Sequence, residues 1–379
     1  MRIAIIGAGP AGLYAGTLLR RHFPDSDIEI YERNPENVTW GFGVVFSDTA
    51  LDFLREDDPE THAAIVPHME MWRDLTLDVL GERVPIDGVG FAAVGRLHLL
   101  QLLTARAREV GLSPKFDADI GDLSRFQDYD LIIGADGLNS LVRQSDDFGV
   151  TLDHLDNKFV WYGTKRPFET LTQSFRQSRH GRFNAHHYRY TPDMSTFIVE
   201  TDSATWRAAG FDGMDEPAAR AVCEEIFADV LEGAPLVANN SHWRNFPKLW
   251  CETWHRDNKV LIGDALHTAH FSIGSGTRLA MEDAIALVRA LKNHSGAVRD
   301  GLAAYQAARQ PIVKKIVTAA NQSADWYEGF AARMDMPAWE FADSYIRRAG
   351  RIDDDRLRKL APAFMAGLDV YRAKQGAAG

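Results

Sequence analysis

The stretch GAGPAG at residues 7–12 constrains the fold of this chain more than any other feature. It follows the β-branched run RIAII and opens the apolar segment AGLYAGTLLRRH, so a strand, a glycine-rich turn and a helix are expected in that order. In the pattern G-x-G-x-x-G, Gly7 allows the tight turn, Gly9 lets a pyrophosphate approach the backbone, and Gly12 lets helix and strand pack closely. Phosphates lie at the helix N-terminus in such a turn, because its first N–H groups are unpaired.

An acidic residue stands where the ribose of a nucleotide would be held. Glu32 follows Gly12 by 20 residues, at the end of the expected second strand DIEIY, and an acid at this place accepts hydrogen bonds from ribose hydroxyls. A carboxylate disfavours a 2′-phosphate, so the site is predicted to bind FAD or NAD rather than NADP. Arg33, the next residue, is a further candidate for cofactor contact.

A second anchor late in the chain favours FAD. The segment 260–287 reads as a buried strand, an aspartate, a glycine-rich turn and a helix. Asp264 would meet the ribityl hydroxyls, although a plain helix cap is the alternative. The helix start, with Gly274, Gly276 and Thr277, would direct N–H groups at the electron-rich pyrimidine edge of a flavin. An NAD-dependent dehydrogenase needs no such second site.

The order of strand-like and helix-like segments predicts an α/β fold with an insertion. A Rossmann-like FAD-binding domain is expected to be interrupted by an antiparallel-sheet substrate domain, whose strands are aromatic and β-branched, and to be followed by a C-terminal helical segment. The predicted division is FAD-binding domain, first part, 1–157; substrate domain, 158–245; FAD-binding domain, second part, 246–300; helical segment, 301–379.

The composition limits the partners. The net charge of −11 disfavours nucleic acid and anionic lipid, and no apolar stretch approaches the roughly 18 residues of a membrane span. An expected first strand from Ile3 leaves no room for a signal peptide, so a cytoplasmic monomer or homodimer with free Cys223 and Cys251 thiols is predicted. No cluster has metal-ligand spacing, so no metal is expected. A second dinucleotide loop is also missing, so NADH or NADPH would visit transiently.

Three motifs in order resemble those of the class A flavoprotein monooxygenases, the para-hydroxybenzoate hydroxylase family: GAGPAG, GADGLNSLVR at 134–143 and GDALH at 263–267. The resemblance implies FAD and an aromatic-ring hydroxylase that uses NAD(P)H and O₂ through a flavin hydroperoxide. It assigns Asp136 to FAD and to NAD(P)H passage, and Arg96 to the FAD pyrophosphate, with a solvated helix start as the alternative for Arg96.

The family carries a G-x-G stretch where this chain has GFGVVF, from Gly41. The resemblance implies that Gly43 and Val44 run beside the isoalloxazine ring, and that Ser47 and Asp48 face the flavin or the substrate. An ordinary loop that leads into a helix is the alternative.

A closer likeness is to the branch that contains salicylyl-CoA 5-hydroxylase, the monooxygenase half of 2-aminobenzoyl-CoA monooxygenase/reductase and a hydroxylase of violacein biosynthesis. Most of the family has proline beside the flavin where this chain has His270 and Phe271. We expect these two residues near the flavin, and His186, Tyr188 and Glu200 on the sheet facing the substrate, because strand residues alternate in direction. A structural role is the alternative for the histidines.

A basic stretch bears on the substrate. Residues 158–190 hold seven lysines and arginines against one acid, Glu169. The stretch suits CoA phosphates, so an aryl-CoA thioester is the preferred substrate. Arg176, Arg179 and Arg182 are the candidate phosphate ligands, and not all three need contribute, because strand alternation sends neighbours to opposite faces. A solvated strand face or a nicotinamide-nucleotide contact are alternatives. Competing functions are hydroxylation of a free aromatic or indole metabolite, a flavin halogenase or reductase, and a non-catalytic FAD-binding protein.

Overall fold

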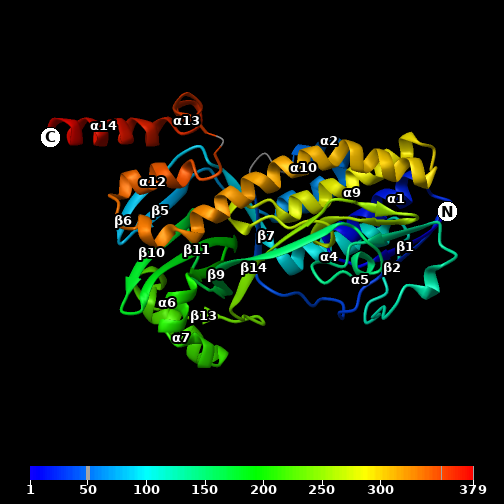
Figure 1. Cartoon of the computed structure of the whole chain (residues 1–379), viewed down its shortest axis with the longest axis horizontal. Coiled ribbons are helices and arrows are strands. Elements are labelled where there is room, and N and C mark those ends of the chain that lie inside the picture. Colours follow the sequence, from blue (N-terminus) through cyan, green and yellow to red (C-terminus); the bar gives the residue numbers. More distant parts are fainter. Residues whose placement is uncertain (48–51, 351, 379) are drawn as a thin grey trace.

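The computed structural model describes residues 1–47, 52–350 and 352–378, and it confirms the predicted mixed α/β architecture (Figure 1). The N-terminal strands and helices form one half of the elongated molecule, and a large twisted sheet with helices on both faces forms the other. The long helix α10 (Val298–Glu328) runs from one half to the other.

The nucleotide-binding half is built on a five-stranded sheet. Its central strands are parallel and buried, as their β-branched residues require. The order is β15 (His255–Arg256), β16 (Lys259–Leu261), β8 (Leu131–Gly134), β1 (Arg2–Ile6) and β2 (Asp27–Tyr31). The helices α1 (Pro10–His22), α4 (Arg96–Glu109) and α9 (Gly276–Asn293) pack together beside it. The N-terminal strands and residues 255–261, which lie far apart in the sequence, therefore complete one sheet.

The second half is an eight-stranded, mostly antiparallel sheet. Its order is β13 (Leu236–Val237), β9 (Val150–Thr164), β12 (Met194–Thr201), β11 (Gly181–Thr191), β10 (Leu171–Ser178), β5 (Leu75–Val79) and β6 (Glu82–Ile86), and β14 (Arg244–Cys251) pairs with β9. The sheet thus extends past the segment 158–245 and recruits residues 75–86, which precede it by some seventy positions in the chain.

The two faces of this sheet pack differently. One face covers a core with α7 (Glu216–Ile226) and α8 (Ala228–Leu231), beside α6 (Ser203–Ala208). The other face, here called the inner face, looks toward α10, the loop before α9 and the C-terminal helices. Strand alternation sends Phe183, Ala185 and His187 to the first face and Asn184 and His186 to the inner face.

Smaller elements join the two halves. A three-stranded sheet runs in the order β3 (Gly43–Ser47), β7 (Phe91–Gly95) and β4 (Glu70–Trp72). The helices α2 (Asp52–Asp57), α3 (Pro59–Ile65) and α5 (Leu141–Gln144) complete the nucleotide-binding half. Cys223 and Cys251 are buried and unpaired, as predicted.

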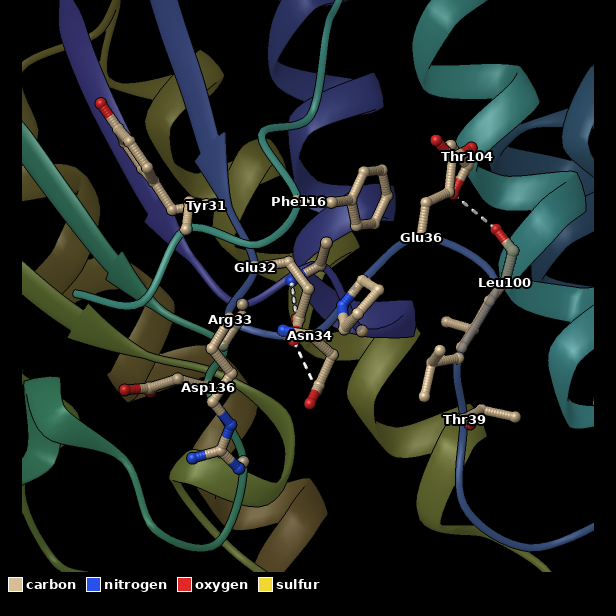
Figure 2. A pocket seen from close by; sticks show the side chains of 18 of the residues that line it. Tyr31, Glu32, Arg33, Asn34, Glu36, Thr39, Leu100, Thr104, Phe116 and Asp136 are labelled. Carbon is tan, nitrogen blue, oxygen red and sulfur yellow. Dashed lines mark hydrogen bonds between the residues drawn. The ribbon is translucent and has the colours of Figure 1, made fainter. Parts of the chain in front are cut away.

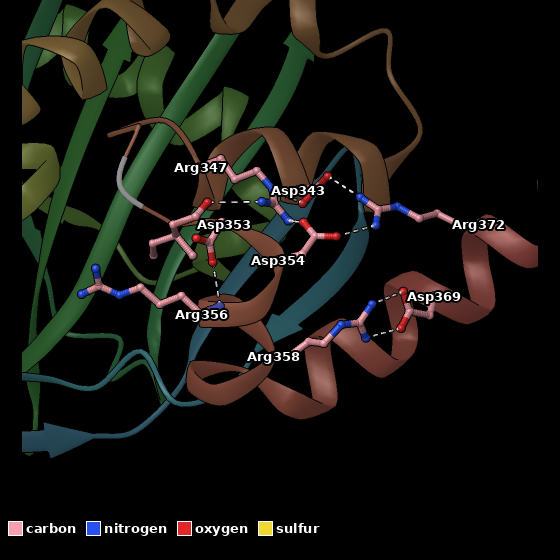
Figure 3. Close-up of polar contacts among 9 residues, drawn as sticks. Asp343, Arg347, Asp353, Asp354, Arg356, Arg358, Asp369 and Arg372 are labelled. Carbon is pink, nitrogen blue, oxygen red and sulfur yellow. Dashed lines mark hydrogen bonds and ion pairs between the residues drawn. The ribbon is translucent and has the colours of Figure 1, made fainter.

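The C-terminal segment is helical, with α11 (Phe330–Arg333), α12 (Ala338–Ile346), α13 (Asp354–Leu360) and α14 (Pro362–Ala378). Ion pairs tie these helices together: Arg347 and Arg372 share Asp343 and Asp354, and Arg358 pairs with Asp369 (Figure 3). Among the described helices, none has the length and apolarity to cross a membrane.

Candidate functional site

The glycine-rich turn has the geometry that phosphate binding requires. Gly7 has φ +105°, and a Cβ on it would lie 2.3 Å from the carbonyl oxygen of Ala135. A Cβ on Gly12 would lie 2.0 Å from the carbonyl oxygen of Gly7. A Cβ on Gly9 would meet nothing within 4 Å, although Gly9 stands directly before α1. The free protein therefore needs Gly7 and Gly12 for packing, and Gly9 leaves space at the helix N-terminus.

Glu32 holds this turn from the end of β2. Its Oε2 accepts the Ala8 N–H at 2.9 Å, and its Oε1 accepts the backbone and side-chain N–H groups of Asn34 at 2.9 and 2.7 Å (Figure 2). A carboxylate has about four acceptor positions. Three are used within the chain, so one remains for a ribose hydroxyl.

A pocket of about 460 Å³ opens beside Glu32. Arg33, Arg96, Asp136 and the Gly7–Pro10 turn line it, together with residues 34–40. Asp136 caps α5 by accepting the Leu141 N–H at 2.6 Å, and its other oxygen is buried without a partner among the described residues. The pocket has the place and the polar lining that the adenosine half of FAD needs.

Arg96 and Asp264 come from distant parts of the chain and interact electrostatically. Desolvation by the surrounding protein raises the pKa of the Asp264 carboxyl, and electrostatic attraction to the Arg96 and His267 side chains opposes that rise. Asp264 nevertheless keeps an exposed surface at the short helix η5 (Gly263–Ala265). An exposed carboxylate in crowded surroundings, beside a cation, suits the polar middle of a dinucleotide.

The start of α9 faces the same region. Gly274 has φ +60° at the end of η6 (Phe271–Ile273), and Gly276 and Thr277 are the first two residues of α9. The unpaired N–H groups of this 18-residue helix carry its positive dipole end. The predicted flavin contacts of these residues thus have a physical basis in the helix terminus.

The structure gives the glycines of GFGVVF a packing role that the sequence did not predict. A Cβ on Gly41, whose φ is +84°, would lie 3.0 Å from the Trp161 ring, and a Cβ on Gly43 would lie 2.5 Å from Tyr190 Cβ. These glycines make room for aromatic side chains of the large sheet. No flat ligand is needed to explain their size.

Neighbours of these glycines also have roles within the chain. The Tyr188 hydroxyl donates to the Gly43 carbonyl at 2.9 Å, so this predicted catalytic group tethers β3 to the sheet. Val44 is buried, and Ser47 pairs with Phe91 at the end of β3. Asp48 lies outside the described residues.

Aromatic rings gather between the inner face and η6. Phe271 lies 5.1 Å from Phe159 and 4.2 Å from His270, measured between ring centroids. Phe246 lies 4.8 Å from His270, and Tyr327 of α10 lies 5.8 Å from it. This aromatic cluster offers flat apolar walls of the kind that hold an aromatic ring.

Two buried histidines belong to this region. The ring of His186 lies 6.3 Å from that of Phe271, and neither of its nitrogens has a hydrogen-bond partner among the described residues. Burial lowers the pKa of His186 to about 3, with a smaller effect from Arg348. Burial likewise lowers the pKa of His270 to about 3, with contributions from His186 and Arg348. Both imidazoles are therefore neutral at physiological pH.

Comparison with known proteins decides the family. A model of the FAD-binding domain matches residues 93–320, and a model of an NAD(P)-binding Rossmann-like domain matches residues 5–43. The chain is 41% identical to salicyloyl-CoA 5-hydroxylase of Streptomyces sp, over all of this chain and 75% of that protein.

The chain is a class A flavin monooxygenase.

Other relatives agree. Identity is 35% to 3-hydroxy-4-methyl-anthranilyl-(aryl-carrier protein) 5-monooxygenase of Streptosporangium sibiricum, over 93% of this chain and 95% of that protein. Identity is 33% to protodeoxyviolaceinate monooxygenase of Chromobacterium violaceum, over 92% of this chain and 94% of that protein. The fold is that of 2-methyl-3-hydroxypyridine-5-carboxylic acid oxygenase, with a TM-score of 0.74 at 19% identity, covering 92% of this chain and 95% of that chain.

The monooxygenase is an FAD-dependent aromatic hydroxylase that uses NAD(P)H. Bound FAD supplies the electron transfer and oxygen activation. The residues of this chain would supply the rest: the Gly7–Gly12 turn and the start of α9 would hold the cofactor, the aromatic cluster would orient a ring, and the buried inner face would exclude water.

The three arginines predicted to bind phosphates do not form one patch in the monooxygenase. Arg176 is largely buried and pairs with Asp78 and Asp229 on the face away from the aromatic cluster. Arg182 points to the opposite face and pairs with Asp335, and Arg179 lies in the turn between β10 and β11 and pairs with Glu225. Strand alternation separates Arg176 from Arg182, as the sequence predicts, and each of the three arginines is paired with an acid, so they do not form one phosphate site.

Some residues near the site were missed from the sequence. Gln173 and Asn184 lie on the inner face beside His186 and Glu200, and Ser323 and Arg348 contact the η6 loop from the C-terminal segment. The alternation of polar 184 and 186 with apolar 183 and 185 was a usable signal for Asn184. The place of Gln173 beside His186 could not be predicted in this way, because it depends on which strand pairs with β11.

Proposed function

We propose that the monooxygenase hydroxylates the ring of an aryl group carried as a CoA thioester, such as salicyloyl-CoA at ring position 5. One observation carries the proposal: the cluster of Phe159, Phe246, His270 and Phe271 lies beside the loop that leads into α9, where a ring would meet the flavin. The 41% identity to a salicyloyl-CoA hydroxylase over the whole chain supports the thioester. The name of a second relative also states a carrier-bound aryl substrate.

In this proposal the residues of the chain act by shape and by neutral polar contacts. His270 and Phe271 close the site against water on the side of α9. His186 and Glu200 reach the substrate from the inner face, where a neutral imidazole can accept a hydrogen bond from a ring hydroxyl or donate one to it. We further propose that the enzyme acts in the cytoplasm as a monomer or homodimer, with NADH or NADPH as a transient visitor.

A substrate panel tests this function. Salicyloyl-CoA, 2-aminobenzoyl-CoA, the two free acids and indole are each incubated with the FAD-loaded enzyme, NADH or NADPH and O₂. We expect NAD(P)H consumption coupled to a product one oxygen atom heavier for a CoA thioester. Hydroxylation of a free acid or of indole alone would replace this proposal with the free-metabolite alternative, which the violacein-pathway relative favours.

A further inference from the structure

Four polar side chains on the inner face are buried and carry polar atoms that have no hydrogen-bond partner among the described residues. Gln173 is 0% exposed, Asn184 1%, His186 3% and Glu200 2%. Seven of their polar atoms have no hydrogen-bond partner among the described residues: Gln173 Nε2 and Oε1, Asn184 Nδ2 and Oδ1, His186 Nδ1 and Nε2, and Glu200 Oε2. Buried polar groups are normally paired, because an unpaired one forfeits its hydration. So many in one place indicate a polar ligand.

Sheet register makes these four residues one patch. Gln173 on β10 stands directly opposite His186 on β11, and Asn184 on β11 stands directly opposite Glu200 on β12. Asn184 and His186 are two positions apart and share a face. Side chains directly opposite each other in neighbouring strands have Cβ atoms about 4.5–5.5 Å apart. The patch is therefore contiguous across three strands, and Phe271 adjoins it at His186.

The patch is uncharged at neutral pH. Burial raises the pKa of Glu200 to about 8, against a hydrogen bond from Asn157 and with a smaller effect from Glu328, so its carboxyl is protonated. His186 is neutral, and carboxamides do not titrate. Glu200 Oε1 accepts from Asn157 at 2.8 Å, which leaves its other oxygen for a ligand.

Two arginines near the patch, Arg348 and Arg176, already have partners. Arg348 is the cation that affects His186 and His270, and it donates to Ser323 Oγ at 2.9 Å and to the carbonyls of Ser272 and Tyr345 at 2.9 Å. Arg176 is tied to acids on the far face. A ligand carboxylate on the patch would therefore lose its hydration without finding either Arg348 or Arg176 free to pair with it.

We propose that Gln173, Asn184, His186 and Glu200 form an uncharged acyl-recognition site, which binds the carbonyl of an aryl acyl derivative and a neighbouring hydroxyl or amino group, and which discriminates against the free aryl carboxylate. Each carboxamide offers a donor and an acceptor together, which matches a carbonyl acceptor beside an O–H or N–H donor. The inference rests on the proposed function in taking an aryl acyl compound as the ligand.

Binding to the FAD-loaded enzyme at pH 7 tests the site without turnover. The probes are salicylamide, which is uncharged, and salicylate, which has the same ring and a carboxylate, and flavin absorbance reports binding. We expect salicylamide to bind at least about tenfold more tightly. Equal or tighter binding of salicylate would overturn the proposal, and loss of that binding in Arg348→Met would then identify Arg348 as a carboxylate partner.

Apolar variants of similar size separate recognition from structure. Gln173→Met and Asn184→Leu should weaken salicylamide binding about tenfold and leave FAD content unchanged. They should also raise the melting temperature of the ligand-free enzyme, because each removes buried unpaired atoms. Ser174→Ala is the matched control, since Ser174 is on the same strand and bonds His187 on the other face. Wild-type affinity for salicylamide in both variants would overturn the proposal.

The two proposals fail in different ways. If the wild-type enzyme hydroxylates a CoA thioester while Gln173→Met and Asn184→Leu bind salicylamide normally, the acyl-recognition site is wrong and the function stands. If these variants lose salicylamide but no thioester is hydroxylated, the site stands and the proposed function is wrong.

Discussion

Ser272 contacts His270 with two donors at the same ring nitrogen: its Oγ lies 2.8 Å and its backbone N lies 3.4 Å from His270 Nδ1. A backbone N–H can only donate, so Nδ1 is the bare nitrogen and the proton is on Nε2. Ser272 Oγ also lies 2.8 Å from Ser323 Oγ, which accepts from Arg348. The C-terminal segment thus orients an imidazole whose Nε2–H is a hydrogen-bond donor.

Removing this imidazole should uncouple the reaction. In His270→Ala we expect FAD content to be retained and product formed per NAD(P)H to fall about tenfold, because loss of the ring between Phe246 and Phe271 admits water. The lost reducing equivalents should appear as hydrogen peroxide, which a peroxidase-coupled assay measures. His180→Ala, in the β10–β11 turn, is the control. Unchanged coupling in His270→Ala would remove this residue from the site.

Gly9 and Gly12 should respond differently to substitution. Gly9→Val should leave the folding of the free protein unchanged and weaken FAD binding about a hundredfold or more, because its side chain would occupy only the space of the pyrophosphate. Gly12→Ala should destabilise the protein itself, since its Cβ would clash with the Gly7 carbonyl. Flavin content and melting temperature of both variants, each prepared with and without FAD, distinguish these outcomes.

Asp264 provides the second test of the cofactor site. Asp264→Ala should lose most of the FAD, since it removes the exposed carboxylate beside Arg96. Asp264→Asn keeps the hydrogen-bond acceptor and should retain more. Wild-type flavin content in Asp264→Ala would remove this residue from the cofactor site.

Glu200 should make stability depend on pH. Its pKa of about 8 in the folded protein lies above the value near 4.3 of an unfolded chain, so the folded state holds the extra proton between these values. The protonated carboxyl therefore contributes its full share to the free energy of unfolding below about pH 4.3. This share is lost as the pH rises to about 8, by up to about 1.4 kcal/mol per pH unit. Glu200→Gln removes this loss. Urea unfolding from pH 5 to 9 should show the free energy of unfolding of the variant increasing relative to that of wild type as the pH rises. A difference that stays constant with pH would contradict a protonated carboxyl.

The arginines of the basic stretch should behave as structural groups to different degrees. Arg176→Ala leaves the largely buried Asp78 without its cation and should destabilise the protein by about 3 kcal/mol. Arg179→Ala breaks an exposed pair with Glu225 and should cost less than about 0.5 kcal/mol. Neither should change the salt dependence of KM for a CoA thioester. A KM increase in Arg179→Ala that diminishes at high salt would restore it as a phosphate ligand.

Local sequence determined the parts of this protein that depend on short-range geometry. The turn at Gly7, the acid at Glu32 and the start of α9 each lie within a few residues of the element that positions them, and the structure places them as the pattern predicts. The three motifs also determined the family and its cofactor. The outward or inward direction of Asn184 and His186 follows from alternation along a single strand.

Tertiary structure alone decided which groups meet. Gln173 joins His186 only because β10 pairs with β11 in one register, and a shift of one residue would send it to the other face. In the sequence Arg176 has no acid close by, but in the structure β5, which lies about a hundred residues earlier, places Asp78 beside it. Gly43 is small because Tyr190 packs on it. Such contacts depend on the pairing of distant strands and on burial, which change both the partners and the charge of a side chain, so no local pattern contains them.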